Sequence, residues 1–107
     1  MAPQKMPDMS RVEMAVLATL VTRQRYGLEI RNTLRDLGQP ISLAGLYTTL
    51  GRLERQGMVT SKWGDETVEE RNGARRRYYE ITGLGVRAIK ETKAVMARVL
   101  RSVPALA

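Results

Sequence analysis

The side chains best suited to bind a ligand lie on one face of a predicted helix between residues 41 and 57, ISLAGLYTTLGRLERQG. Ser42 is a suitable N-cap for this helix, and Gly57 is a suitable C-terminal stop. At about 100° per residue, its leucines form one stripe that we expect to face a core: Leu43, Leu46, Leu50 and Leu53. The opposite face is small and cationic, and consists of Ala44, Thr48, Arg52 and Arg55, with Gly45 and Gly51 beside them and Tyr47 on the flank.

Helix stability does not explain this outer face. Two glycines and two threonines inside a helix each cost up to about 1 kcal/mol relative to alanine. The major groove of B-DNA, about 12 Å wide, admits a helix whose outer side chains are small near its start, and arginine can bind guanine or phosphate there. The alternative is a solvated face with incidental arginines, and the helical wheel alone ranks the two equally.

A run of three arginines opens a second candidate binding element, the predicted strand at residues 75–81. Residues 58–63 form another candidate strand, and the polar segment 64–74 between them predicts a β-hairpin with a long tip, which is a wing. Because side chains alternate along a strand, Arg75 and Arg77 share one side and could follow a phosphate backbone. The alternative is a charged edge strand that discourages pairing. We expect Trp63 to pack at the base of the wing.

Composition narrows the function classes. Lysine and arginine number 18 against 11 aspartates and glutamates, so the formal net charge is +7, which favours an acidic partner. The chain has no cysteine and no histidine, which excludes a disulfide framework, thiolate chemistry and a zinc site with nitrogen or sulfur ligands. Since the carboxylates gather in a loop without a rigid acid–base pair, we predict no enzymatic activity, no metal and no cofactor.

Two further predicted helices precede the basic one. The first is capped by Ser10 and runs to about Thr22. The second resumes after Tyr26-Gly27, ends at Gly38, and has an N-terminus that could meet a phosphate. Its predicted core side chains are Leu28, Ile30, Leu34 and Leu37. Two helices joined by the short link at residues 39–40, the second of them basic outside, are a helix-turn-helix arrangement.

The helical period returns after Thr82, which is the predicted N-cap of a last helix that Pro104 ends. A helix of some 20 residues spans about 30 Å, so its apolar stripe is longer than a small core can cover, and a second copy of the chain is the natural cover. The longest apolar run, residues 14–21, is too short to cross a bilayer, and the N-terminal segment has no secretory signal, so we expect a cytoplasmic protein without a membrane partner.

The predicted fold class is mainly α with a small β-hairpin wing: a winged helix-turn-helix followed by a C-terminal dimerisation helix. We expect a flexible N-terminal arm at residues 1–9. A winged helix-turn-helix DNA-binding domain would then occupy residues 10–82, and the C-terminal dimerisation helix residues 83–107.

The chain resembles the PadR family of winged helix-turn-helix transcriptional regulators, in the short class with a single C-terminal helix. The matching stretches are VEMAVLATL, YGLEI, SLAGLYTTLGRLERQGMVTSKW and RRRYYEITGLG, which together cover nearly all of the chain. The resemblance implies a homodimer, joined through the first and last helices, that binds a palindromic operator near its own promoter and represses. Some relatives bind planar aromatic compounds between the C-terminal helices, but the last helix here has no aromatic residue, which argues against that mode of ligand binding. The identity of any small-molecule effector is unknown.

The leading hypothesis is a homodimeric, sequence-specific regulator that binds double-stranded operator DNA and represses its own or a neighbouring operon. Its predicted DNA-binding residues are Ser42, Ala44, Tyr47, Thr48, Arg52, Arg55, Arg75 and Arg77. The alternative from another class is a winged-helix protein-interaction adaptor without specific DNA binding, which would use the wing acids and the last helix.

Overall fold

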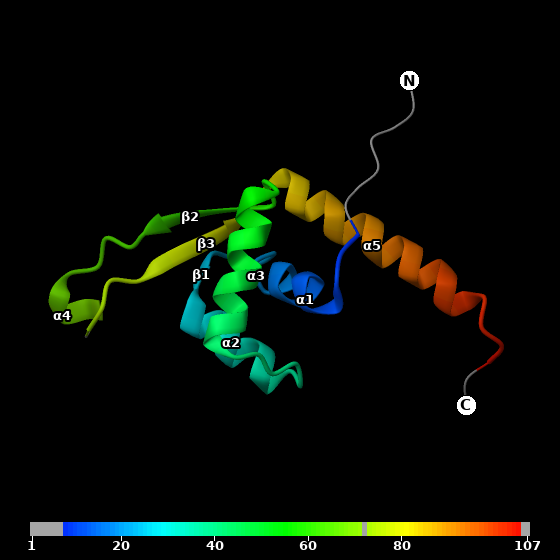
Figure 1. The fold of residues 1–107 in the computed structure, drawn as a ribbon, viewed down its shortest axis with the longest axis horizontal. Coiled ribbons are helices and arrows are strands. Elements are labelled where there is room, and N and C mark those ends of the chain that lie inside the picture. Colours follow the sequence, from blue (N-terminus) through cyan, green and yellow to red (C-terminus); the bar gives the residue numbers. More distant parts are fainter. Residues whose placement is uncertain (1–7, 72, 106–107) are drawn as a thin grey trace, which may run out of the picture.

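The computed structural model describes residues 8–71 and 73–105. Residues 1–7 of the predicted arm and residues 106–107 therefore lie outside the described part. Figure 1 shows a hairpin that extends to one side of a helical body and a long last helix that extends to the other. The elements are α1 (Arg11–Thr19), β1 (Arg25–Tyr26), α2 (Gly27–Asp36), α3 (Leu43–Arg55), β2 (Val59–Trp63), α4 (Val68–Arg71), β3 (Arg77–Ile81) and α5 (Gly83–Arg101). The predicted fold class, mainly α with a small wing, is confirmed.

Helix α1 begins at the predicted cap but ends earlier than expected. The Ser10 hydroxyl accepts from the Glu13 amide at 3.1 Å, and the Glu13 carboxylate accepts from the Ser10 amide at 3.1 Å, which is a complete capping box. The predicted end at Thr22 is wrong, because Arg25 donates to the Thr19 carbonyl at 2.6 Å and so satisfies a carbonyl at the end of the helix.

Helices α2 and α3 are bounded by the residues that the sequence indicated. Gly38 and Gly57 follow them in the left-handed region, with φ of 89° and 76°. Ser42 caps α3 by accepting from the Gly45 amide at 3.0 Å. The turn between α2 and α3 is therefore short, and α3 crosses the body in front of α1 and α2 (Figure 1).

The sheet has three antiparallel strands in the order β1-β3-β2. Strand β1 and the short helix α4 at the tip of the wing were not predicted, and β3 begins at Arg77 instead of Arg75. In the hairpin, Val59 pairs with Ile81 at the base, and Trp63 pairs with Arg77 where the strands end. The wing is thus anchored to the body by its base, and its charged residues lie beyond the core.

The core lies where α1, α2 and α3 meet the base of the sheet. It consists of Val16, Leu17, Leu20, Ile30, Leu34, Leu46, Leu50, Leu53, Met58, Val59, Tyr79 and Ala88. The prediction that three further leucines lie in the core is wrong, because Leu43 is 37% exposed, Leu28 is 42% exposed and Leu37 is 76% exposed. Leu43 and Leu28 stand in the first turns of their helices, and Leu37 follows the end of α2, so all three lie where the helices leave the core.

Among the described residues, helix α5 packs against the body through its first half. Thr82 accepts from the Gly85 amide at 3.2 Å and donates to the Gly57 carbonyl at 2.7 Å, which ties the start of α5 to the end of α3. Gly85 and Ala88 are buried, whereas the second half exposes Val95, Met96, Val99 and Leu100. Within the described residues, no helix is both long and apolar enough to cross a membrane.

Candidate nucleic-acid interface

The outer face of α3 is exposed, as the helical wheel predicts. Ser42, Ala44, Thr48, Arg52 and Arg55 are all exposed, while Leu46, Leu50 and Leu53 on the opposite face are fully buried. The buried leucines fix the rotation of α3 about its own axis. A face with small side chains at its start and arginines further along is therefore held outward.

Thr48 lies near the middle of this face. Its side chain is exposed, and its hydroxyl donates to the Ala44 carbonyl at 3.0 Å, which leaves the hydroxyl oxygen able to accept a further hydrogen bond. A hydroxyl oxygen can accept from a base amino group, and a methyl group can contact the methyl of thymine. Thr49 makes the equivalent bond to the Gly45 carbonyl at 2.9 Å but is buried, so it belongs to the packing.

Tyr47 lies on the flank of α3 that faces the wing, and it is 50% exposed. Its ring lies on the backbone of Gly27 at the start of α2. A Cβ added to Gly27 would clash with the Tyr47 hydroxyl and would stand 2.8 Å from its Cζ atom. The absence of a side chain at Gly27 therefore allows the ring to lie there, with its polar end beside the N-terminus of α2.

Arg52 lies on the other flank of α3, beside α1. Its Nη1 atom is 3.9 Å from Oε2 of Glu13, and the Glu13 residue is only 7% exposed. The same carboxylate caps α1. Sequence analysis predicted Arg52 as a DNA-binding residue, and the structure places it with part of its charge balanced by a buried acid.

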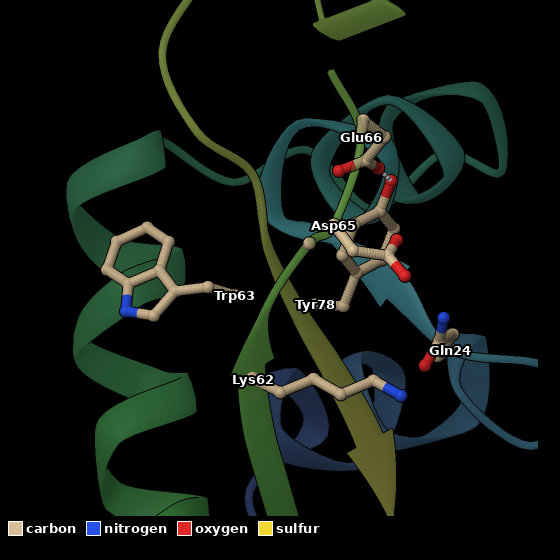
Figure 2. Close-up of a pocket in the computed structure, with 7 residues that line it drawn as sticks. Gln24, Lys62, Trp63, Asp65, Glu66 and Tyr78 are labelled. Atoms are coloured by element: carbon tan, nitrogen blue, oxygen red, sulfur yellow. Dashed lines mark hydrogen bonds between the residues drawn. The ribbon is translucent and has the colours of Figure 1, made fainter. Parts of the chain in front are cut away.

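In the wing, Trp63 departs from the expected packing at the base. The residue is 53% exposed, and two guanidinium groups lie over its ring, with the Arg75 Cζ at 5.1 Å and the Arg77 Cζ at 5.5 Å from the ring centre. Both distances fit cation–π contacts. Figure 2 shows the ring on the opposite side of the strand from Tyr78 and Glu66. The predicted pairing of Arg75 and Arg77 on one side is confirmed.

A hydrogen-bond chain ties the wing to α3. Glu54 of α3 accepts from the Ser61 hydroxyl of β2 at 2.6 Å, and Ser61 accepts from Arg77 of β3 at 2.9 and 2.7 Å. The Arg77 Nη2 is also 3.9 Å from Glu54 Oε1. These hydrogen bonds connect α3, β2 and β3, and they fix the position of the Arg77 guanidinium group relative to α3.

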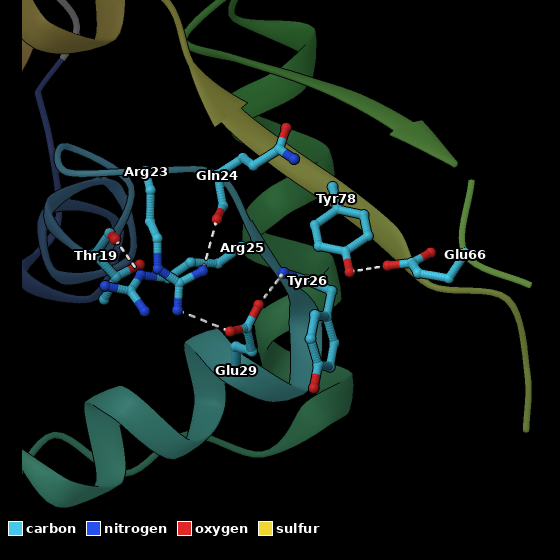
Figure 3. Close-up of polar contacts among 8 residues, drawn as sticks. All are labelled: Thr19, Arg23, Gln24, Arg25, Tyr26, Glu29, Glu66 and Tyr78. Carbon is cyan, nitrogen blue, oxygen red and sulfur yellow. Dashed lines mark hydrogen bonds and ion pairs between the residues drawn. The ribbon is translucent and has the colours of Figure 1, made fainter. Parts of the chain in front are cut away.

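Arg76 points to the other side of β3, as alternation predicts, and its Cζ lies 4.6 Å from the centre of the Tyr26 ring. Tyr26 meets Tyr78 edge to face, with ring centres 5.6 Å apart. The Tyr78 hydroxyl donates to Glu66 (Figure 3), and this hydrogen bond, together with burial, raises the pKa of Tyr78 above its ordinary value. Strand β1 thus connects the wing to the start of α2.

The start of α2 is held by Glu29. Figure 3 shows this carboxylate accepting from Arg23 at 2.9 Å and from the Tyr26 amide at 3.2 Å. Burial alone would raise the pKa of Glu29, but the hydrogen bonds from Arg23 and Tyr26 outweigh it, and the pKa is lowered. The carboxylate therefore stays charged beside the residues that support Tyr47.

Between α3 and the wing lies a hollow of about 530 Å³. Its lining includes Leu28, Tyr47, Trp63, Arg75 and Arg77. Three predicted residues, Tyr47, Arg75 and Arg77, are thus brought to one place. Ser42, Ala44, Thr48 and Arg55 lie on α3 outside this lining, and Arg52 lies on its far flank.

A second, smaller cavity of about 290 Å³ lies on the other side of β2 (Figure 2). Lys62 faces Asp65 and Glu66 across it, so its charges are mixed and it does not favour an anion. Over residues 8–71 and 73–105, no cluster of three or more acidic, histidine or cysteine side chains could hold a metal ion.

Sequence reasoning missed the contacts that Trp63, Glu54 and Ser61 make at the candidate interface. The register of the hairpin would have predicted the contact of Trp63, because Trp63 pairs with Arg77 across the strands and this pairing brings a ring and a guanidinium group together. Glu54 could not be connected to Ser61 from sequence, because that contact depends on how α3 packs against β2.

Comparison with known proteins gives a consistent result. The model of the transcriptional regulator PadR-like family matches residues 16–91. A PadR family transcriptional regulator from Eggerthella lenta DSM 2243 is 31% identical with a TM-score of 0.74, covering 85% of this chain and 76% of that one. A PadR family transcription regulator from Clostridium difficile R20291 has the same fold, with a TM-score of 0.77, 22% identity, and coverage of 87% and 94%.

An uncharacterized protein from Lysinibacillus sphaericus is 30% identical over 79 residues, which is 71% of this chain and 69% of that protein. The family and the fold are those of transcriptional regulators and not of enzymes. The match covers all of α2, α3 and the wing, where the candidate interface lies. The chain therefore belongs to the PadR-like family of transcriptional regulators.

Proposed function

We propose that this protein is a homodimeric, sequence-specific DNA-binding regulator that represses its own or a neighbouring operon. The observation that carries the proposal is the outward face of α3, which is small and cationic and is flanked by the wing arginines. The proposed contact residues are Ser42, Ala44, Tyr47, Thr48, Arg52, Arg55, Arg75 and Arg77. The net charge of +7 supports attraction to a polyanion.

Within this surface, we assign different tasks to different side chains. Thr48 in the middle of α3 and Arg52 would contact base edges in the major groove. Arg55, Arg75 and Arg77 would contact phosphates and so set the position of the protein on the duplex. For Arg52 to reach a base, its guanidinium group must leave Glu13, which is 3.9 Å away.

The proposed dimer rests on α5. Its second half exposes Val95, Met96, Val99 and Leu100 by 48 to 58% each, and Val103 beyond the helix by 40%. A stripe of this kind on one helix is typical of a protein–protein contact. A second copy that covers it would make the contact isologous, and the two α3 helices would then be related by a dyad. Such a pair could enter successive major grooves about 34 to 36 Å apart.

The direct test is fluorescence anisotropy with duplex DNA from the region upstream of the gene and with a scrambled duplex, across a salt series. We expect binding to the upstream duplex to be tighter by about a thousandfold, with a steep dependence on salt. Equally weak, salt-sensitive binding to a panel of duplexes from the whole neighbourhood would contradict the proposal and favour an interaction adaptor.

Replacing Arg52 tests base reading. The Arg52→Ala variant should lose about 1 to 3 kcal/mol on the operator and less on random DNA. Arg35→Ala is a matched control, because Arg35 is an exposed arginine on α2 outside the proposed surface. Equal losses on both duplexes would show that Arg52 contributes only charge.

A further inference from the structure

Trp63 holds an unusual position for the one tryptophan of the chain. It ends β2, is 53% exposed, and faces the hollow between α3 and the wing. An exposed indole of this size gives up much of the free energy that burial in the core would provide. Its contacts are instead with arginines, which suggests that the ring serves the surface.

Two guanidinium groups share this ring. The Arg75 Cζ lies 5.1 Å and the Arg77 Cζ 5.5 Å from its centre. Arg75 makes no ion pair with any residue in the part of the chain that the structure describes. Arg77 lies 3.9 Å from Glu54, the same separation as Arg52 from Glu13, but the Glu54 side chain is 36% exposed against 9% for Glu13, so water screens its charge more. The ring holds both cations without adding a negative charge, whereas a buried carboxylate would hold them and neutralise them.

The hollow beside this cluster has the chemistry to take a segment of nucleic-acid backbone. Its volume is about 530 Å³, with Tyr47 on the α3 side and the two arginines on the wing side. Phosphates prefer forked guanidinium donors, and the apolar face of a sugar can lie against an aromatic ring. The phosphates of a nucleic-acid strand would balance the positive charges of these two arginines.

We propose that Trp63 is a positioning residue of the DNA-binding surface, and that it holds Arg75 and Arg77 at the hollow for contact with the sugar–phosphate backbone. The inference rests on the proposed DNA-binding function. The Glu54–Ser61–Arg77 chain supplies the second anchor, since it fixes one of the two arginines relative to α3. The wing cations and the outer face of α3 therefore bind one duplex as a unit.

The first test replaces the ring. Trp63→Ala should weaken binding to operator DNA by about tenfold and make the salt dependence shallower, because two held cations become mobile. Trp63→Phe keeps a smaller aromatic face and should recover most of the loss. Val68→Ala, an exposed apolar residue in α4, is the control and should bind like the wild type.

A double-mutant cycle separates positioning from other roles. In a chain that already carries Arg75→Ala and Arg77→Ala, Trp63→Ala should change the affinity by less than about twofold. The same tenfold loss in both backgrounds would overturn the proposal, since Trp63 would then contact DNA itself or support the wing as a whole. No loss in either background would also overturn it.

Failure of the proposed DNA-binding function would be distinguished from failure of the positioning role by the behaviour of the wild-type protein. If the wild-type protein binds no duplex DNA even at low salt, the proposed function fails, and the cycle is not needed to show it. Wild-type binding together with a Trp63→Ala variant that binds normally contradicts only the positioning role. Circular dichroism on each variant checks that the hairpin and helices are retained.

Discussion

The two flanks of α3 hold their arginines in different ways. On the flank beside α1, Arg52 lies near the buried carboxylate of Glu13. On the flank beside the wing, Arg75 and Arg77 lie over the ring of Trp63, and the hydroxyl of Ser61 accepts from Arg77. Both arrangements fix the direction of a long side chain that would otherwise lose conformational entropy on binding.

The two arrangements differ in how much of the positive charge of the arginine remains available to a ligand. A carboxylate fixes an arginine and neutralises it, and if the arginine leaves, the acid stays behind in a poorly hydrated place. On the wing flank the ring of Trp63 adds no charge, and the carboxylate near Arg77, Glu54, is 36% exposed and therefore hydrated, which leaves more of the arginine charge available to a phosphate. On the proposed DNA-binding surface, the wing flank would therefore hold DNA of any sequence, while the α1 flank would oppose binding unless the base contact is good enough to replace Glu13.

Removing the wing arginines should produce the largest effect. The Arg75→Ala and Arg77→Ala double variant should lose about two phosphate contacts, which is about fiftyfold in affinity at about 0.1 M salt, on operator and random DNA alike. The salt slope should fall by about 2 in the same titration. Arg87→Ala with Lys90→Ala removes the same charge from exposed positions of α5. If that control variant loses as much affinity, the wing arginines contribute only net charge and make no specific contact with DNA.

Displacing Tyr47 should have the next largest effect. In the Gly27→Ala variant, the new methyl group would stand 2.8 Å from Tyr47 Cζ, so the half-exposed ring must swing away. We expect about a five- to tenfold loss of operator affinity, because the ring lines the hollow, while stability stays within about 1 kcal/mol of the wild type.

The control for this variant is Gly83→Ala in the first turn of α5, where an added Cβ meets nothing within 4 Å. Both variants are measured by anisotropy and by thermal unfolding. Normal operator binding by Gly27→Ala would exclude a role for the position of Tyr47.

Neutralising Glu13 tests the α1 flank and should give a smaller effect of opposite sign. Glu13→Gln preserves the hydrogen bonds of the capping box but releases Arg52, so random DNA should bind about threefold more tightly. The ratio between operator and random DNA should fall. Glu91→Gln on α5 makes the same change in net charge at an exposed position. An equal gain in that control would show that only the total charge matters.

Much of the fold could be predicted because its signals are local. Ser10, Ser42 and Thr82 were recognised as caps from the residue type and the apolar period that follows. The buried stripe of α3 followed from the spacing of its leucines, although Leu43 lies beyond the core. Alternation along a strand placed Arg75 and Arg77 together without knowledge of any contact.

The features that were missed depend on contacts between distant segments. Strand β1 has only two residues and exists because β3 lies beside it. Trp63 was expected at the base of the wing, since an aromatic residue is usually buried, but the register places it opposite Arg77 and beyond the core. The pairing of Arg52 with Glu13 requires α1 and α3 to cross, and no sequence spacing indicates that.

The smallest expected effect concerns the acid that supports the wing flank from α2. The pKa of Glu29 is lowered from 4.5, so its contribution to stability is complete above pH 4.5 and is lost as the pH falls through the lower pKa of the folded state. We expect Glu29→Gln to be less stable than the wild type at pH 7, by up to about 1 kcal/mol, because Glu29 is partly exposed. Below pH 4.5 the difference should shrink, as thermal unfolding at pH 7, 5 and 3 would show. A difference that stays constant with pH would mean that packing, and not the charge on Glu29, holds the start of α2 beneath Tyr47.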